Sequence, residues 1–498
     1  MLFNSLEFLI FFPFVVIITY IVPSKLRCYW LLASSYYFYM CWNARYAVLI
    51  LFSTIITYLS GILLEYIKKQ SWKEARKIKY KKWCVACSCI LNLTVLFIFK
   101  YIGFAIENIA LFFNLFHINL NIPEFDIILP VGISFYTFQA LGYTVDVYRD
   151  DIYAEKNFFR YALFVSFFPQ LVAGPIERSQ NLLKQLNFSE KFNFERARDG
   201  LLLMLWGFFL KMVLADRIAV FVDCVYENTD IFGGYFILAA TILFAIQIYC
   251  DFYGYSIIAV GTAEILGVQL MENFDAPYLA QSVGEFWRRW HISLTQWFRD
   301  YLYIPLGGGK RGKKKKYLNK IIVFLVSGLW HGAGWAFVIW GCLNGVYQII
   351  GEILEPVKDR VFKLLRLNKN SLAHKSMKVL ITFFLIDFTW LFFRAGSLKK
   401  AVMILNSIVS VHNPWILFNG EIYRAGLDSR NFGLMVISIV LLILADICKY
   451  KGIVIRQVIQ SQDYWFRWIF IAFSVCVILL FGVWGSAYNA ANFIYFQF

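Results

Sequence analysis

The chain has 498 residues, of which 60% are hydrophobic and only 16% are charged, and its mean hydropathy is +0.60. Soluble globular domains are about 45–50% apolar and about 25% charged, so this composition argues against a soluble protein and excludes a disordered chain or a small disulfide scaffold. The net charge of +16 would suggest nucleic-acid binding in a soluble protein. Here the basic residues stand in short runs between apolar stretches, which is typical of cytoplasmic loops. We therefore expect a polytopic membrane protein that binds no nucleic acid.

Apolar stretches along the chain predict its helices. A membrane-spanning helix needs about 20 apolar residues, so we expect about 11 spans, with re-entrant or interfacial helices where a stretch is short or rich in Gly and Pro. No positive region precedes the first stretch and no small-residue cleavage site follows it, which favours a retained helix over a signal peptide. The expected stretches are 8–22, 29–42, 46–66, 84–116, 128–148, 159–176, 199–222, 232–250, 255–270, 319–335, 336–354, 376–393, 432–447 and 466–484.

Four basic stretches orient these helices. Lys68–Lys82 holds eight basic residues and one acidic residue, and Lys310–Lys316 holds six basic residues and one Gly. Lys358–Lys369 and Lys449–Arg456 are also basic. Because basic loops stay on the cytoplasmic side, we expect all four there. The predicted fold class is an all-α polytopic membrane protein, with a single integral-membrane domain over residues 1–498 and no separate soluble domain.

His331 is the first candidate for chemistry within the membrane. It follows an apolar helix that starts beside a basic run, and the 12 residues from Asn319 to His331 place it about 18 Å along that helix. The hydrocarbon core is about 30 Å thick, so we expect the imidazole near its middle. An ionisable residue there is by default a functional-site hypothesis, and a neutral imidazole can act as a general base. The alternative is a structural His that is hydrogen-bonded between helices.

His291 lies in a Trp- and Arg-rich segment that is unlike an ordinary span. Helical spacing would place Trp287, His291 and Thr295 on one face, with Trp290 beside them. Arg288, Arg289 and Arg299 interrupt the apolar pattern. We expect an interfacial or re-entrant helix that lines a water-accessible cavity, and an anchoring role for the Trp and Arg residues is the simpler alternative to catalysis.

The segment then ends in three glycines before a basic run. Backbone N–H groups of Gly308 and Gly309, together with Lys310 and Arg311, could hold a phosphate. A flexible cytoplasmic turn explains the same residues. The glycines formally match nucleotide-binding patterns, but no strand or βαβ unit surrounds them, and serine-esterase and zinc-protease motifs are absent from the sequence.

Two aspartates, Asp146 and Asp251, and a group of three cysteines also lie in or beside apolar stretches. Each aspartate could pair with an arginine such as Arg149, Arg288 or Arg289 and hold helices together without chemistry. The cysteines at 84, 87 and 89 have no second Cys or His pair at zinc spacing, so we expect no metal site.

Several motifs in order along the chain match one known family. The chain resembles membrane-bound O-acyltransferases (MBOAT) of the alginate O-acetylase type, over nearly its whole length. The matching segments are Pro130–Gln139, Phe167–Ile176, Asn273–Tyr278, Phe286–Ser293, Asp300–Gly308, Trp330–Gly332 and Phe493–Phe498, with the core motifs within residues 128–395.

The resemblance implies a catalytic role for His331, with His291 as the second family histidine. It also implies an MBOAT-like helical bundle around a funnel or tunnel, into which an acyl donor enters from the cytoplasmic side. Where relatives often carry another His, this chain has Asn344, which argues against a set of three catalytic histidines. Candidates for lining the tunnel are Trp287, Arg288, Trp290, Trp330, Asp251 and Asn344, and candidates for binding the donor's phosphates are Gly308, Gly309, Lys310 and Arg311.

The activity expected from this resemblance is O-acetyl transfer to hydroxyls of an extracytoplasmic polysaccharide, either an alginate-like exopolysaccharide or a cell-wall glycan. The donor would be acetyl-CoA or an acyl-phosphopantetheine carrier, with no bound cofactor. An extracytoplasmic partner protein would finish the transfer, and the location would be a bacterial cytoplasmic (inner) membrane. D-alanyl transfer to teichoic acid is the alternative within the same fold, and a transporter or flippase is the alternative from another class.

Overall fold

The computed structural model describes residues 1–119, 129–172, 174–187, 191–365, 368–484 and 494, and within these ranges the regular elements are all helices. The described chain forms two compact units. Unit 1 comprises Met1–Met204 and Ser256–Met271, and unit 2 comprises Leu205–Tyr255 and Glu272–Phe498. The predicted all-helical fold class is confirmed.

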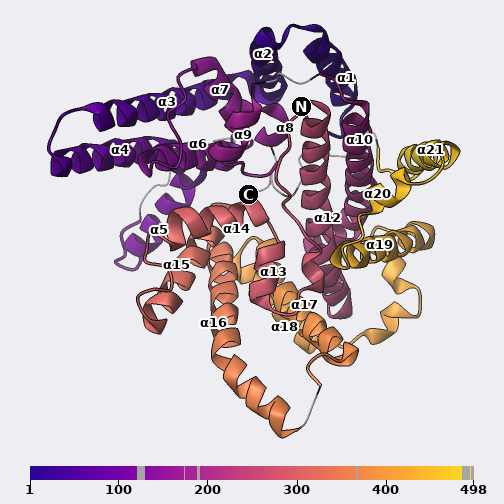
Figure 1. Cartoon of the computed structure of the whole chain (residues 1–498). Coiled ribbons are helices and arrows are strands. Elements are labelled where there is room, and N and C mark those ends of the chain that lie inside the picture. The colour runs from indigo at the N-terminus through magenta and orange to yellow at the C-terminus, as the bar shows by residue number, and fades with distance from the viewer. Residues whose placement is uncertain (120–128, 173, 188–190, 366–367, 485–493, 495–498) are drawn as a thin grey trace. The chain divides into compact units, whose positions relative to one another are not determined.

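Unit 1 contains the N-terminal helices, with α6 buried at its centre. The helix α6 packs on α3, α4 and α7, and its neighbours α3 and α4 run side by side as a long pair (Figure 1). Gln139 of α6 is almost fully buried; its Nε2 donates to the Phe164 carbonyl over 2.6 Å, and its amide also pairs with that of Gln170. Two motifs of the family resemblance therefore form packing contacts in this unit. The helices are α1 (Leu6–Ile21), α2 (Ser24–Asn43), α3 (Ala47–Lys69), α4 (Glu74–Lys100), α5 (Ile102–Asn114), α6 (Ile133–Tyr148), α7 (Phe158–Ser166), α8 (Phe168–Leu171), α9 (Ser179–Gln185) and most of α10 (Phe194–Phe208).

Unit 2 contains the helices that carry the two histidines of interest. A π-helical segment, η2 (Phe209–Ala215), follows α10, and a second one, η4 (Arg299–Tyr303), follows α14. Single-turn π segments occur frequently at functional sites. The other elements used below are α11 (Asp216–Glu227), α12 (Tyr235–Ile265), η3 (Pro277–Leu279), α13 (Val283–Arg289), α14 (Ile292–Phe298), α15 (Lys313–His331), α16 (Trp335–Leu364), α17 (Leu372–Ala395), α18 (Leu398–Ser410), α19 (Ser429–Tyr450), α20 (Ile455–Gln460) and α21 (Tyr464–Phe481).

The α15–α16 hairpin forms the most extensive helix pair of unit 2, and glycines let its two backbones approach closely. A Cβ on Gly328 would lie 2.3 Å from the Phe337 carbonyl oxygen, and one on Gly341 would lie 2.2 Å from the Phe324 carbonyl oxygen. Helix pairs in membranes pack through such small residues, because these permit backbone contact. At the tip, a Cβ on Gly332 would lie 2.2 Å from the Phe337 ring, so the turn after His331 requires glycine.

Seven helical segments of the described chain are long and apolar enough to cross a membrane, and the first of them, Ser24–Lys69, is 46 residues long. The expected stretches mostly correspond to helices, but several are divided or merged, and some helices lie outside them. The stretches 232–250 and 255–270 form one helix, α12, whereas 84–116 is divided between α4 and α5. The helix α18 was not expected, and at 13 residues it is too short to read as a span.

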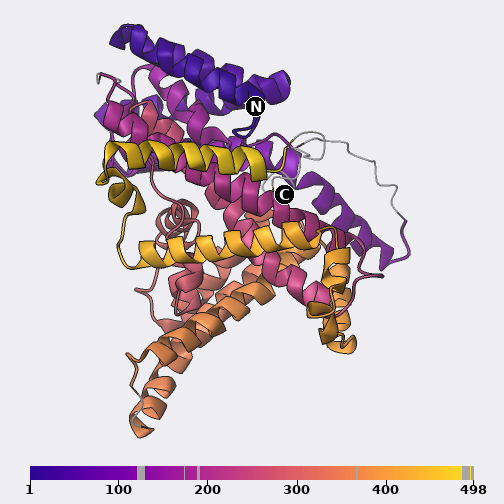
Figure 2. The ribbon, with the colours of Figure 1, turned by 90° about the vertical axis from the view of Figure 1, so that its right-hand side faces the viewer.

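A buried ionic group ties η2 to α11 and α12 in unit 2. Lys211 Nζ lies 2.5 Å from Asp251 Oδ1 and 2.8 Å from Asp216 Oδ1, and at most 7% of each side chain is exposed. The expected arginine partner of Asp251 is thus wrong, because η2 places a lysine directly against it. The adjacent Arg217 donates to the Phe481 carbonyl over 2.7 Å, which attaches α21. The golden α19 and yellow α21 of Figure 2 are joined by α20, and both contact η2.

Asp146, in unit 1, has a different kind of contact. It accepts a hydrogen bond from Ser179 Oγ of α9, and its side chain is 4% exposed. The bond links α6 to α9, consistent with the helix-holding role that was expected for this carboxylate.

Candidate active site

His331 is the last residue of α15 and lies among aromatic rings. Its side chain is 6% exposed, and its ring centroid lies 4.9 Å from that of Trp330, 5.0 Å from Trp340 and 5.4 Å from Phe393. The helix that carries it begins at Lys313 and ends at the hairpin tip. A helix C-terminus carries partial negative charge, which stabilises a cation on the last turn. His331 therefore lies at the negative end of the α15 dipole.

His291 lies at a break between α13 and α14, where one continuous helix was expected. Its φ of +43° is in the left-handed region, which is uncommon for residues other than glycine. The segment around Asn273 fixes this turn: the Asn273 carbonyl accepts from Ile292 N over 2.9 Å, and Asn273 Oδ1 accepts from Ser293 Oγ over 2.6 Å. The prediction that Trp287, His291 and Thr295 share one helix face is therefore wrong.

One contiguous group of rings, here called the aromatic cluster, joins the two histidines. His291 packs on Phe252 at 4.7 Å and on Trp330 at 5.9 Å, and Trp330 packs in turn on His331. The structure thus brings the two predicted catalytic residues into contact with the same indole, that of Trp330. The cluster consists of Phe252, Tyr278, Phe286, Trp287, Trp290, His291, Trp330, His331, Trp340, Trp390 and Phe393.

Asn344 of α16 connects three parts of this cluster. Its Oδ1 accepts from the Trp287 indole Nε1 over 3.0 Å, and its Nδ2 donates to the Trp340 carbonyl over 2.9 Å and to Thr389 Oγ1 over 3.3 Å. Asn344 is fully buried. Its amide satisfies groups from α13, α16 and α17 at once, so it fixes the orientation of Trp287.

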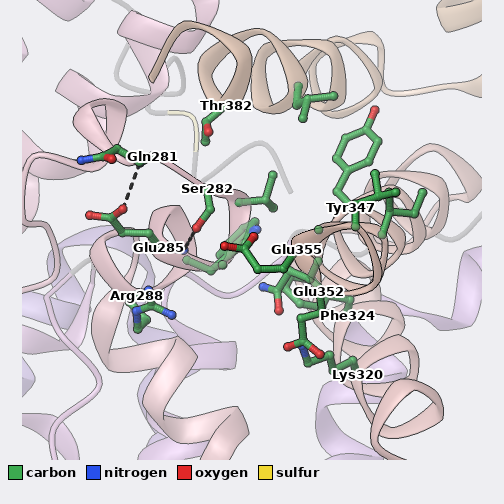
Figure 3. A pocket seen from close by; sticks show the side chains of 18 of the residues that line it. Gln281, Ser282, Glu285, Arg288, Lys320, Phe324, Tyr347, Glu352, Glu355 and Thr382 are labelled. Atoms are coloured by element: carbon green, nitrogen blue, oxygen red, sulfur yellow. Dashed lines mark hydrogen bonds and ion pairs between the residues drawn. The ribbon is translucent and has the colours of Figure 1, made fainter. Parts of the chain in front are cut away.

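A large cavity opens beside the aromatic cluster, between α13, α14, η4, α15, α16 and α17. Its volume is about 1540 Å³. Figure 3 shows Ser282, Arg288, Lys320, Tyr347 and Thr382 among the side chains that approach it from these helices. Pockets for small ligands commonly measure about 300–1,000 Å³, so this one has room for a ligand larger than most.

The cavity has an excess of positive charge. Glu352 pairs with Lys316 over 2.8 Å and also with Lys320, and Lys369 pairs with Asp359. Four carboxylates line the cavity, at positions 285, 352, 355 and 359, against eight cations: Arg288, Arg299, Lys313, Lys316, Lys320, Lys358, Lys369 and Lys378. This balance suits an anionic ligand.

The cavity reaches to within one helical turn of His331. Ser327 and Phe324 of α15 line it, and Ser327 precedes His331 by four residues, a rise of about 6 Å on the same helix face. Trp287 also lines it and packs on Trp340 at 5.5 Å, which in turn packs on His331. Two indoles therefore lie between the cavity and the imidazole.

The remaining predicted residues fall into three places. Trp290 and Trp330 belong to the aromatic cluster, and Arg288 lines the cavity. Asp251 belongs to the ionic group with Lys211, although the next residue, Phe252, packs on His291. Gly308, Gly309, Lys310 and Arg311 lie in the turn between η4 and α15 and are not among the residues that line the cavity; Asn319 Nδ2 donates to the Gly308 carbonyl over 2.9 Å.

Sequence reasoning missed several residues of this region. Lys211 and Asp387 are ionisable residues within apolar stretches, and this signal alone could have identified both. Trp340 and Phe393 read as ordinary apolar residues, so nothing in the sequence indicates that they surround His331. The cavity residues Lys358 and Lys369 stand in a stretch that reads as a cytoplasmic loop, and Lys378 stands at the start of an expected apolar stretch.

The arrangement suits group transfer away from water. A general base needs a neutral imidazole within reach of the proton that it removes, and a closed aromatic surrounding excludes competing hydrolysis. The adjoining cavity, with its excess of cationic side chains, has room for the charged part of a large anionic ligand.

Comparison with known proteins identifies the family. The sequence model described as "MBOAT, membrane-bound O-acyltransferase family" matches residues 154–362. The chain is 32% identical over 451 residues to the probable alginate O-acetylase AlgI of Azotobacter vinelandii, covering 90% of this chain and 86% of the relative. It is 29% identical to the peptidoglycan O-acetyltransferase of Helicobacter pylori, covering 94% and 91%. It is also 29% identical to the teichoic acid D-alanyltransferase of Streptococcus thermophilus, over 53% of this chain and 68% of the relative. The chain therefore belongs to the membrane-bound O-acyltransferase family, and it is an integral-membrane O-acyltransferase.

Proposed function

We propose that this enzyme moves an acetyl group from a cytoplasmic thioester donor to hydroxyls of an extracytoplasmic polysaccharide, in a bacterial cytoplasmic membrane. The relatives named as O-acetylases match about nine-tenths of the chain, whereas the D-alanyltransferase matches about half of it. This difference supports acetate as the acyl group. D-alanyl transfer remains the second candidate, because the D-alanyltransferase of Streptococcus thermophilus matches about half of this chain. The family assignment sets the transporter hypothesis aside.

The cavity is the observation that carries this proposal. Acetyl-CoA and acyl-phosphopantetheine carriers both present a phosphate-bearing part and a long arm that ends in a thioester. The cationic wall, which includes Lys313, Lys316 and Lys358, suits the phosphates, and the basic run at the start of α15 suits a cytoplasmic entrance. The volume of about 1540 Å³ accommodates the whole of coenzyme A, which favours the free donor.

His331 is the proposed base. It takes the proton of the acceptor hydroxyl as the hydroxyl oxygen attacks the thioester carbonyl carbon. The tetrahedral intermediate then breaks its C–S bond, and the leaving thiolate takes the proton back from the imidazolium. The products are an ester and a free thiol. The position of His331 at the end of α15 supports this role, because the helix terminus stabilises the imidazolium between the two steps.

An extracytoplasmic protein partner is proposed to complete the transfer to the polysaccharide. His291 is proposed as the second histidine of the site, and its ring contact with Trp330 supports a role in shaping the surroundings of His331.

The test measures alkali-labile acyl groups on surface polysaccharide in a strain that lacks the gene and in the same strain complemented with it. The released acids are identified by chromatography, which separates acetate from D-alanine. Acetate that disappears with the gene and returns with it is the expected result. D-alanine that behaves in this way would replace the first candidate with the second. If neither acid changes, the proposed substrate class is wrong.

A further inference from the structure

We propose that the indole N–H of Trp340 donates a hydrogen bond to the oxyanion that forms during acyl transfer at His331. Trp340 is fully buried, and its Nε1–H has no hydrogen-bond partner among the described residues. A buried donor without a partner costs about 1–3 kcal/mol, so such a group in a folded protein calls for an explanation. This inference rests on the proposed role of His331.

The location of Trp340 matches what an oxyanion donor requires. Its ring centroid lies 5.0 Å from that of His331, with the two planes at 79°. On its other side it packs on Trp287, which lines the cavity, at 5.5 Å. In this proposal, a thioester that reaches His331 from the cavity has to come past Trp287 and Trp340, which would bring its carbonyl next to the Trp340 indole.

The surroundings hold this indole in place. Asn344 Nδ2 donates to the Trp340 carbonyl, and the Trp390 and Phe393 rings pack on it at 5.8 and 5.5 Å. A donor that is fixed before reaction stabilises developing charge without reorganising at that moment, and the effect is larger in a buried site.

Two of the neighbouring indoles, Trp287 and Trp390, each lack one of the features that Trp340 combines. Trp287 already donates its N–H to Asn344 Oδ1. Trp390 belongs to the same cluster and is 1% exposed, but it makes no ring contact with His331 within the part of the chain that the structure describes. Trp340 thus combines a spare donor, burial and contact with the proposed base.

The chemistry needs one such donor. When the acceptor oxygen bonds to the carbonyl carbon, the carbonyl π electrons move to its oxygen, which becomes the oxyanion that the Trp340 N–H stabilises. When these electrons re-form the C=O bond, the C–S bond breaks and the sulfur takes the proton from the imidazolium. The indole keeps its own proton throughout.

The test compares Trp340→Phe with Trp390→Phe, which removes an equally buried indole N–H from the same cluster. The rate at which alkali-labile acyl groups appear on polysaccharide is measured in cells after induction, at equal membrane levels by immunoblot. We expect Trp340→Phe to slow transfer about 10²–10³-fold, the usual effect of removing one oxyanion donor. We expect Trp390→Phe to slow transfer less than about tenfold, because it loosens the packing around Trp340 but leaves the donor N–H intact. Equal losses in both variants would overturn the proposal.

A second measurement distinguishes hydrogen bonding from packing. Membranes are given acetyl-CoA or its dithioester analogue, in which sulfur replaces the carbonyl oxygen and accepts hydrogen bonds poorly. Wild type and Trp390→Phe should prefer the oxygen donor strongly, and Trp340→Phe should lose at least about tenfold of that preference. If Trp340→Phe does not accumulate in membranes, the wild-type enzyme alone gives the test. A wild-type rate with acetyl-CoA that is less than about threefold above the rate with the dithioester would contradict the proposal. His331→Ala serves as reference: full activity in that variant would contradict the proposed base and not the oxyanion donor.

Discussion

His331 and the Lys211 group are both buried polar sites in unit 2, yet their surroundings differ in kind. Lys211 lies between two carboxylates, so its charge is neutralised within 2.8 Å, and α11 and α12 are held together as a result. His331 is surrounded by three aromatic rings, none of which is charged. Buried charges that pair with one another hold helices together, whereas a titratable side chain among aromatic rings close to a cavity is placed for chemistry. The distinction separates two residue types that the sequence presents alike, as polar residues inside apolar stretches.

The largest effect on stability is expected from Lys211→Met. The substitution leaves Asp216 and Asp251 buried without their cation, and removing one partner of a buried ion pair costs about 3–5 kcal/mol. Asp251→Asn keeps the Lys211–Asp216 pair, so the loss should be clearly smaller. Thermal unfolding in detergent measures both variants. Equal unfolding temperatures for the two variants would contradict the claim that Lys211 is the residue on which this buried group depends.

Asn344→Leu is expected to have the next largest effect, on catalysis more than on folding. It removes the acceptor of the Trp287 N–H, and an unsatisfied buried donor costs about 1–3 kcal/mol. Because Trp287 then loses its fixed orientation at the cavity wall, we expect kcat to fall about tenfold, the equivalent of about 1.4 kcal/mol. Thr389→Val is the matched control, since it removes the 3.3 Å contact with Asn344 and the Thr389 bond to the Ile386 carbonyl but leaves the Trp287 bond intact. A control that loses as much activity as Asn344→Leu would show that the Trp287 bond has no special role.

Removal of cavity charge should act on donor binding. Lys313, Lys358 and Lys378 line the cavity, and no ion pair to them is found in the described chain. Replacing all three with Ala should raise the KM for acetyl-CoA about tenfold with kcat nearly unchanged, because each exposed charge contact contributes about 0.2–1 kcal/mol. The same change at Lys399, Lys400 and Lys451, which do not line the cavity, should leave KM unaltered. An equal change of KM in both triple variants would contradict donor binding in this cavity.

The smallest effect is expected at the surface of unit 1. Lys68 Nζ lies 2.6 Å from Asp150 Oδ1, and hydrogen bonding from Lys68 holds the pKa of Asp150 below its usual range. Stability from this pair is therefore present above the ordinary pKa of an aspartate and is lost as the pH falls through the lowered value. Because 62% of the Asp150 side chain is exposed, Asp150→Asn should cost under about 0.5 kcal/mol at pH 7. An unfolding shift as large as that of Asp251→Asn would contradict the contrast between buried and exposed charges.

Much of the helical architecture follows from apolar length, because a membrane helix must satisfy its backbone internally and its apolar run is long. The stretch that carries His331 was predicted as a helix for this reason, and α15 is one. The break at His291 was not predicted, since it depends on Asn273 hydrogen bonds to residues about 20 positions away. The partner of Asp251 was missed for the same reason: Lys211 is distant in sequence, and a π-helical turn sets its direction.

The two histidines that the sequence singled out lie against one indole, that of Trp330, and their catalytic roles stay predictions. The glycine-rich turn was chosen for phosphate binding because it resembles a phosphate loop locally, whereas the cavity gathers lysines from α15, α16 and α17 that no local pattern relates to one another. Trp340 could not be distinguished from the other tryptophans until its unused N–H and its contact with His331 were seen together.

The central claim is that His331 is the base of an acetyl transfer. The most direct test gives radiolabelled acetyl-CoA to membranes that contain wild type, His331→Ala or His412→Ala at equal levels, and follows alkali-labile label on polysaccharide. His412 is exposed, so its variant controls for the loss of a histidine. We predict that His331→Ala loses at least about 10²-fold of the rate, in the range of general-base catalysis, while His412→Ala transfers as wild type does. A His331→Ala rate within about threefold of wild type would contradict the account, because a general base contributes at least about 10²-fold.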